Sequence, residues 1–300
     1  MFNGEKYIHE TISSVLNADI AVPYEYIVLN DGSEDSTAFI LDKFKHQIKV
    51  LSHTNIGESA TVNRGIKVAQ GDFIVVISAD DPLLTGDLLN EACGKLADEP
   101  GLVALYPDWK IINELGETIF INNVPEYSDD VMIGQCRCLP GPGTVFRKDA
   151  ALQVGGRREK WKYVGDYDFW LRLSRVGNIR KLSGFFAQWR QSMNSTSISQ
   201  RGVEMANERI RVIEEFLKEN ELPIYLCRNA RGNSHYLASR LAFFDSRING
   251  KRLLFSAFKF QKGWPSQAKI LVVMYLLLTP ISAIAAKPVK GLILRKNSYK

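Results

Sequence analysis

The chain has 300 residues, of which 45% are hydrophobic and 24% charged, and its net charge is +5. A chain of this length and composition can bury a large core, which excludes a disordered tail and a mini-protein. The four cysteines, Cys93, Cys136, Cys138 and Cys227, are too few and too scattered for a disulfide framework or a zinc finger. We therefore expect a folded protein of a reducing compartment.

The net charge hides an asymmetry between the two parts of the chain. Residues 1–200 carry 20 lysines and arginines against 26 acidic residues, whereas residues 201–300 carry 18 against 7. No acidic residue follows Asp245, and eleven cationic residues do. Anionic lipid and nucleic acid are both attracted by such a basic segment.

An uncharged run from Ile270 to Ala286 lies inside this basic segment, between Lys269 and Lys287. Nucleic-acid-binding modules do not need such a run, so a lipid surface is the better-matched partner. The run has 17 residues and is interrupted by Pro280, which favours a helix in the membrane interface or a re-entrant hairpin over a clean span. A buried core helix is the alternative interpretation.

In chain order, the hydrophobic pattern of the first part alternates between helices and strands. Apolar spacing predicts helices at 7–16, 36–44 and 57–69. Runs rich in β-forming residues predict strands at 24–29, 48–52 and 73–77. This alternation indicates an α/β fold with an open, mainly parallel sheet and helices on both faces. In such sheets, ligands collect at the carboxyl ends of the strands.

Two polar clusters fall at such strand ends. The segment 30–33, with Asp31 at its centre, offers a carboxylate and backbone N–H groups to a base or ribose, although the same residue types form ordinary turns. Asp80 and Asp81 follow the strand at 73–77, and adjacent carboxylates repel unless a cation or a donor lies between them. Mg²⁺ or Mn²⁺ binds through such carboxylates plus substrate phosphates. The alternative for this pair is a helix N-cap ahead of Pro82.

The rest of the chain adds a hairpin, a loop and further helices. A hairpin is predicted over 109–124, and the Gly/Pro-rich loop at 139–147 runs into a strand. A helix begins at Gly165, with Asp166 and Asp168 in its first turn, where the macrodipole favours anions. Helical patterns without obvious chemistry span 202–218 and 228–244.

These residues resemble the family 2 glycosyltransferases of the GT-A fold over about residues 1–200. The matching segments are Phe2–Ile8, Asn30–Thr37, Asn55–Gly57, Asn63–Gly65, Gly71–Ile74, Ala79–Asp81, Val145–Arg147, Gly155–Gly156, Asp166–Arg172 and Trp189–Arg190. Each segment is weak alone, but ten in the family's order are a strong match.

The resemblance implies a GT-A (nucleotide-diphospho-sugar transferase) domain that moves a sugar, with inversion, from a nucleotide-diphosphate donor to a hydroxyl of a glycan or lipid-linked acceptor. The expected setting is surface polysaccharide or glycolipid synthesis. Asp166 matches the family's general base, and Asp80 and Asp81 match its metal-binding region, which implies a Mg²⁺ or Mn²⁺ cofactor. The residues expected to bind the nucleotide sugar are Asn30, Asp31, Ser33, Asn63, Asp80 and Arg190.

Several features depart from the family's pattern. Ser78 stands where an aspartate is usual, Gly165 where a glutamate is usual, and Ser192 where a histidine is usual. The sequence also shows no apolar strand ahead of Phe2-Asn3, so we expect an N-terminally shortened or degenerate domain. A catalytically inactive domain that binds a sugar nucleotide or a partner protein is the alternative to an enzyme.

We accordingly predict three parts: a GT-A domain at 1–200, a helical extension at 201–250, and a basic, apolar, membrane-associating segment at 251–300. This division fits a peripheral or monotopic enzyme on the cytoplasmic face of the inner or plasma membrane, in contact with anionic lipid and not with nucleic acid. Side-chain types alone do not specify the donor sugar or the acceptor.

Overall fold

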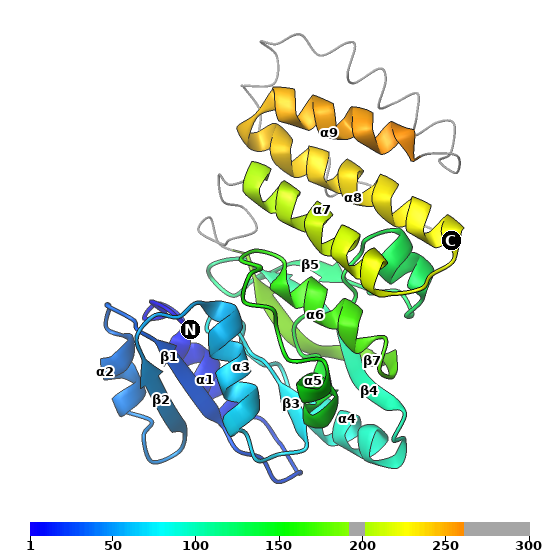
Figure 1. Cartoon of the computed structure of the whole chain (residues 1–300). Coiled ribbons are helices and arrows are strands. Elements are labelled where there is room, and N and C mark those ends of the chain that lie inside the picture. Colours follow the sequence, from blue (N-terminus) through cyan, green and yellow to red (C-terminus); the bar gives the residue numbers. More distant parts are fainter. Residues whose placement is uncertain (192–201, 261–300) are drawn as a thin grey trace.

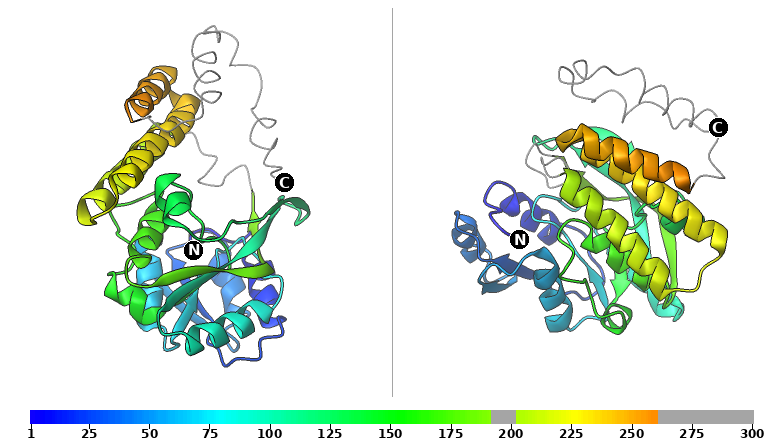
Figure 2. Two further views of the ribbon diagram at one scale, coloured as in Figure 1. Left: turned by 90° about the vertical axis from the view of Figure 1, so that its right-hand side faces the viewer. Right: turned by 45° about the horizontal axis from the view of Figure 1, so that its top comes forward.

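The computed structural model describes residues 1–191 and 202–260. An α/β unit forms the N-terminal part, and the helices α7 (Gly202–Glu219), α8 (Ile224–Asp245) and α9 (Arg247–Lys259) stack above it (Figure 1). Helix α9 is the outermost of these three (Figure 2). Ser192 and the uncharged run at 270–286 lie outside the described residues.

The first sheet is a parallel pair of strands, β1 (Ile27–Asp31) and β2 (Lys49–His53), connected through α2 (Thr37–Asp42). Helix α1 (Ile8–Leu16) packs on this pair through a small core that contains Ile8, Ile12 and Val28. Helix α3 (Glu58–Val68) follows β2. These elements confirm the three helices and the first two strands that the hydrophobic pattern predicts.

Met1 lies against the free side of β1. Its amino group donates to the carbonyl oxygen of Leu29 at 2.8 Å, and its carbonyl oxygen accepts from the N–H of Asp31 at 2.7 Å. The first residue of the chain therefore occupies part of the edge that a further strand would use. The expectation of a shortened domain stays a prediction.

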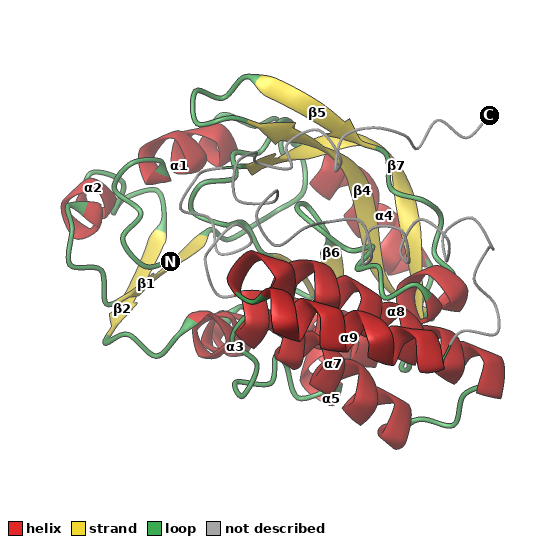
Figure 3. Cartoon of the chain, turned by 90° about the horizontal axis from the view of Figure 1, so that it is seen from above, coloured by secondary structure: helices red, strands yellow, loops and turns green. Residues whose placement is uncertain are grey.

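The second sheet contains five strands, and its centre is β4 (Leu102–Ile112). On one edge of β4, β6 (Val145–Arg147) pairs with residues 104–105 and β5 (Thr118–Asn122) with residues 109–112, both antiparallel. Strand β3 (Phe73–Val75) continues this side by pairing antiparallel with β6. On the other edge, β7 (Asn178–Arg190) pairs with β4 in parallel. Figure 3 shows β1 and β2 apart from β4, β5 and β7.

The α/β class is confirmed, but the expectation of a mainly parallel sheet is wrong for the second sheet. The β4–β5 hairpin and the short β6 both run against β4, so only the β4–β7 pairing in this sheet of the described chain is parallel. A tight turn at residues 113–117 permits only an antiparallel return, whereas β7 reaches β4 after a long connection through helices.

Both faces of the second sheet are covered, which explains why residues 102–107 are buried without alternation. Helix α4 (Asp87–Asp98) packs on one face through Leu88, Ala92 and Leu96. Helix α6 (Gly165–Leu173) covers the other face, where Phe169 and Trp170 pack edge-on around Phe146 with ring centroids 5.5 and 5.4 Å away. The π-helix η1 (Asp130–Gly134) and α5 (Lys148–Gln153) complete the fold.

Two glycines near the start and in the middle of α4 provide a matched test of this packing. A Cβ on Gly86 would lie 2.2 Å from the carbonyl oxygen of Asp19, whereas one on Gly94 would meet nothing within 4 Å. We expect Gly86→Ala to lower the free energy of unfolding by about 1–3 kcal/mol through overpacking. Gly94→Ala should raise it by about 0.5–1 kcal/mol, because alanine favours the helix. Urea denaturation measures both, and equal midpoints would contradict the close approach of residue 19 to α4.

Candidate functional site

The end of β1 is tied to the loop that precedes α3. The buried Asp31 carboxylate accepts from the backbone N–H of Ile56 at 2.7 Å and from that of Gly57 at 3.1 Å. Gly32 has a φ of 71°, and a Cβ there would lie 2.6 Å from the backbone nitrogen of Asn55. Glycine is therefore required where the two loops touch, and Asp31 holds them together.

Asn30 and Ser33, the other residues predicted at this strand end, also bind backbone groups. Asn30 Oδ1 accepts from the Ser33 N–H at 3.0 Å, and the Ser33 hydroxyl accepts from the N–H of Asn3 at 2.9 Å. The three predicted residues thus lie together, as expected. In this structure, each has a partner within the chain and shapes the loop.

Asp80 and Asp81 lie in the loop between β3 and α4. Asp81 is buried, and its Oδ1 accepts from the backbone N–H of Arg190 at 2.7 Å. Burial, and then the neighbouring charge of Asp80, raise the pKa of Asp81 to about 7. Burial also raises the pKa of Asp80. The next helix begins only at Asp87, so the N-cap alternative for this pair is wrong.

Arg190, the last residue of β7, is 1% exposed. Its Nε donates to the carbonyl oxygen of Asp80 at 2.9 Å, and its Nη2 donates to Glu10 Oε2 at 2.7 Å. Its Nη1 lies 3.2 Å from the carbonyl oxygens of both Asn113 and Glu114. Every nitrogen of the guanidinium therefore has a protein acceptor. The predicted nucleotide contact of Arg190 stays a prediction; in this structure its guanidinium holds the Asp80-Asp81 loop.

Asp166 lies in the first turn of α6 and remains accessible to solvent. The surrounding protein raises its pKa by desolvation, and the nearby Arg157 guanidinium partly opposes that increase. Its Oδ1 accepts from the N–H of Tyr167 at 2.7 Å. An accessible carboxylate with a raised pKa has the properties that a general base needs.

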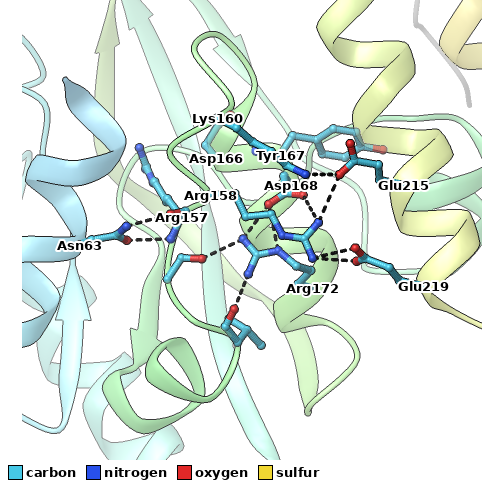
Figure 4. Close-up of polar contacts among 12 residues, drawn as sticks. Asn63, Arg157, Arg158, Lys160, Asp166, Tyr167, Asp168, Arg172, Glu215 and Glu219 are labelled. Carbon is cyan, nitrogen blue, oxygen red and sulfur yellow. Dashed lines mark hydrogen bonds and ion pairs between the residues drawn. The ribbon is translucent and has the colours of Figure 1, made fainter. Parts of the chain in front are cut away.

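Asp168, two residues further along α6, is 2% exposed and is bound to Arg172 on the next turn of the same helix. Arg172 Nη2 lies 2.6 Å from Asp168 Oδ2, and the same guanidinium donates to the carbonyl oxygens of Val154 and Gly156 (Figure 4). Asp168 therefore fixes the turn around Gly156. Its ion pair supports the assignment of the base to Asp166.

Asn63, on α3, fastens the loop that carries Arg157. Its side-chain amide donates to the Arg157 carbonyl oxygen at 2.8 Å and accepts from the Arg157 N–H at 2.7 Å (Figure 4). Arg157 Nη1 in turn lies 2.6 Å from Glu58 Oε1. Asn63 thus fixes the backbone of Arg157, whose charge acts on the pKa of the predicted base. Sequence reasoning missed Arg157, for which the signal was the Gly155-Gly156 turn directly ahead of it.

The glycine at position 165 has a packing reason. A Cβ there would lie 2.9 Å from Ser59 Oγ, because the start of α6 approaches α3 closely. A glutamate at this position would have to displace Ser59. The close packing of α6 on α3 therefore fits a glycine at position 165, where the family usually has a glutamate.

Comparison with known proteins bears on these residues. Residues 1–117 match the family model described as "Glycosyl transferase family 2". Over these residues the chain is similar to the family 2 glycosyltransferases. The predicted resemblance to this family is therefore confirmed, and the match supports an enzyme. Inside the matched part lie Asn30, Asp31, Ser33, Asn63, Asp80 and Asp81.

The curated relatives of this chain are longer proteins. Hyaluronan synthase of Pasteurella multocida is 25% identical over 228 residues, which are 75% of this chain and 23% of that protein. Poly-beta-1,6-N-acetyl-D-glucosamine synthase of Staphylococcus epidermidis is 28% identical over 165 residues, which are 51% of this chain and 39% of that protein. The match thus spans less than half of either relative.

Solved structures show the fold of this chain. Residues 1–349 of S. aureus TarS, in complex with UDP, align with a TM-score of 0.55 at 19% identity, covering 87% of this chain and 90% of that one. Mannosyltransferase PcManGT from Pyrobaculum calidifontis, in complex with GDP-Man and Mn²⁺, aligns with a TM-score of 0.55 at 14% identity, covering 93% and 79%. The predicted GT-A fold is confirmed.

The different surroundings of the two aspartates on α6 predict unequal effects on stability. Asp168→Asn leaves the Arg172 guanidinium buried without its counter-charge, so the free energy of unfolding should fall by about 3 kcal/mol. Asp166 is accessible to solvent, so Asp166→Asn should change the free energy of unfolding by no more than about 0.5 kcal/mol. Denaturant titration of both variants measures this difference. A larger loss for Asp166→Asn than for Asp168→Asn would contradict the assignment.

Proposed function

We propose that this chain transfers a sugar, with inversion, from a nucleotide-diphosphate donor to a hydroxyl of a glycan or lipid-linked acceptor during surface polysaccharide or glycolipid synthesis. The observation that carries the proposal is the accessible Asp166 carboxylate of raised pKa, held beside Arg157 in a family 2 domain. Relatives named as hyaluronan, chondroitin and poly-N-acetylglucosamine synthases support a polysaccharide product.

The proposed chemistry is a single displacement at the anomeric carbon. The acceptor oxygen forms a bond to that carbon while the bond to the diphosphate oxygen breaks on the opposite side, and the configuration inverts. Asp166 takes the proton from the acceptor hydroxyl as the bond forms. The diphosphate leaves with the electron pair of the broken bond, so its negative charge grows and needs stabilisation.

Asp80 and Asp81 have the chemistry to hold a divalent cation with the donor. Their carboxylate oxygens are the hard ligands that Mg²⁺ and Mn²⁺ prefer, and their mutual repulsion would be relieved by a cation. Within the described residues no group of three or more His, Cys, Asp or Glu side chains is placed to hold a metal. The donor's phosphates would therefore complete the coordination. A bound cation would neutralise charge on the departing diphosphate.

The second candidate function is a domain that binds a sugar nucleotide without turnover. Two observations favour it: Ser78 stands where the family has an aspartate, and the guanidinium of Arg190 is occupied by protein acceptors. Nucleotide binding without sugar transfer would identify this alternative.

We place the proposed activity at the cytoplasmic face of an anionic membrane. The basic composition after Asp245 supports this location. Helix α9 exposes Ile248 and Phe255, with Lys251 and Arg252 between them, so the described start of the basic segment presents apolar and cationic side chains together. Across residues 1–191 and 202–260, no helix meets the length and apolarity that crossing a bilayer needs.

Turnover with a panel of nucleotide sugars tests the proposed reaction. Asp166→Asn keeps the shape of the side chain and removes its basicity, so kcat should fall by about two to four decades. Glu214→Gln is the control and should leave kcat unchanged, because the Glu214 side chain pairs with Arg231 of α8. Activity retained by Asp166→Asn would show that another group is the base.

Metal binding is expected to require both nucleotide and a deprotonated Asp81. Because the pKa of Asp81 lies at about 7, it is protonated below that pH, and a cation must displace its proton. The affinity for Mn²⁺ in the presence of UDP or GDP should therefore rise by about tenfold per pH unit up to about pH 7 and level off above it. Calorimetry across this range measures the effect. Tight metal binding without nucleotide, or a flat pH profile, would contradict the site.

The basic segment at 251–300 is expected to bind anionic membranes, since each cation near such a surface contributes about 1 kcal/mol. Flotation with phosphatidylserine vesicles at low salt should recover the full chain, and neutral vesicles should recover much less. Removing residues 261–300, which include the uncharged run, should abolish flotation. A full chain that stays unbound to anionic vesicles would exclude this location.

A further inference from the structure

Glu208, on α7, is a buried carboxylate to which the proposed reaction assigns no role. It is 4% exposed, and its oxygens accept three consecutive backbone N–H groups: those of Lys162 at 3.0 Å, Tyr163 at 2.6 Å and Val164 at 2.8 Å. Hydrogen bonds to an ionised acceptor are the stronger class, and here three of them fix one short stretch of backbone.

That stretch leads directly into α6. The residue at the N-cap of α6 is Val164, whose side chain makes no capping hydrogen bond, although serine, threonine, asparagine or aspartate is usual there. Glu208 accepts the N–H of Val164, the group that a glutamate or glutamine at the third helical position accepts in a capping box. That position holds Tyr167 here, so this contact comes from α7. Asp166, the proposed base, lies two residues further on.

The loop at residues 157–164, which leads into α6, is held by side chains from two helices, α7 and α3. On α7, Glu219 binds Arg158 Nη2 at 2.8 Å, and Glu215 pairs with Lys160 (Figure 4). On α3, Asn63 holds the backbone of Arg157 (Figure 4). The Glu215 and Glu219 pairs are partly exposed, and such pairs contribute little. Glu208 is the buried member of the set. The residues that it binds, 162–164, are the part of the loop nearest to Asp166 along the chain.

We propose that Glu208 is a positioning residue for Asp166: by fixing the backbone of residues 162–164 it sets where the base lies at the start of α6. Helix α7 is then part of the catalytic unit, because its Glu208 positions the base. This inference rests on the proposed function of Asp166, and it places the boundary of the functional unit beyond residue 200.

Glu208→Gln tests the inference with little change in shape. The amide retains one acceptor oxygen but turns an N–H₂ group toward at least one backbone N–H of the loop, so a hydrogen bond is lost. The matched control is Glu214→Gln on the same helix, where Glu214 pairs with Arg231 of α8 at 3.0 Å. Glu208→Asp, which keeps the charge on a shorter side chain, is the milder variant if Glu208→Gln folds poorly.

Three measurements are made on each full-length variant. In Glu208→Gln, the amides of residues 162–164 should exchange hydrogen about tenfold faster or more. The NMR ¹³C chemical shift of the Asp166 carboxyl carbon should change. The value of kcat should fall about tenfold or more because a small displacement of the base suffices, while the Kd for UDP or GDP stays within about twofold. In all three measurements, the values for Glu208→Asp should lie between those of Glu208→Gln and the wild type. Glu214→Gln should match the wild type in all three.

Unchanged amide exchange would show that Glu208 does not hold the loop and would overturn the inference. Faster exchange with an unchanged kcat and an unchanged Asp166 shift would overturn it as well, because the loop would then not place the base. If the wild type turns over no donor, the proposed function fails on that result. The exchange rates and the Asp166 shift still decide the inference about placement.

Discussion

The buried guanidinium of Arg190 joins parts of the chain that are far apart in the sequence. It ties the end of β7 to Glu10 on α1, to the Asp80-Asp81 loop and to the turn between β4 and β5. A buried charge is tolerated only where its hydrogen bonds are satisfied, so these segments must keep their relative positions. Two adjacent carboxylates repel each other, and Arg190 is what gives them a fixed place. The proposed donor end of the site depends on this contact.

The part of the proposed site that would receive the acceptor, around Asp166, depends on a second set of buried charges. Arg172, paired with Asp168, fixes the turn at Gly156, and Asn63 holds the next residue. Glu208, on α7, accepts a backbone N–H at the other end of the same loop. Asp166 itself is left accessible between these fixed points. In both halves, buried charged side chains hold the backbone, and the aspartates with raised pKa values are the ones proposed for chemistry.

Local patterns sufficed to predict α1, α2, α3, the first three strands and the β4–β5 hairpin, because apolar periodicity and turn residues determine such elements over short stretches. They also located the aspartates at the strand ends. The thirteen residues of β7 and its parallel pairing with β4 depend on a contact between distant segments. The same holds for Arg190, whose motif suggests phosphate but whose acceptors come from residues 10, 80, 113 and 114. Glu208 lies in an ordinary amphipathic helix, and only the docking of α7 on the loop before α6 reveals its contacts.

We infer that Arg190 acts by geometry and not by supplying positive charge to the donor. The Arg190→Lys variant tests it, because lysine keeps the charge and loses the planar fork that reaches three sets of acceptors. The decisive measurement is the calorimetric affinity for UDP or GDP in saturating Mn²⁺, at a temperature where the variant is folded by circular dichroism. We predict that the metal-dependent affinity falls by about tenfold or more, since the Asp80-Asp81 loop is no longer fixed. An affinity equal to that of the wild type would contradict the account.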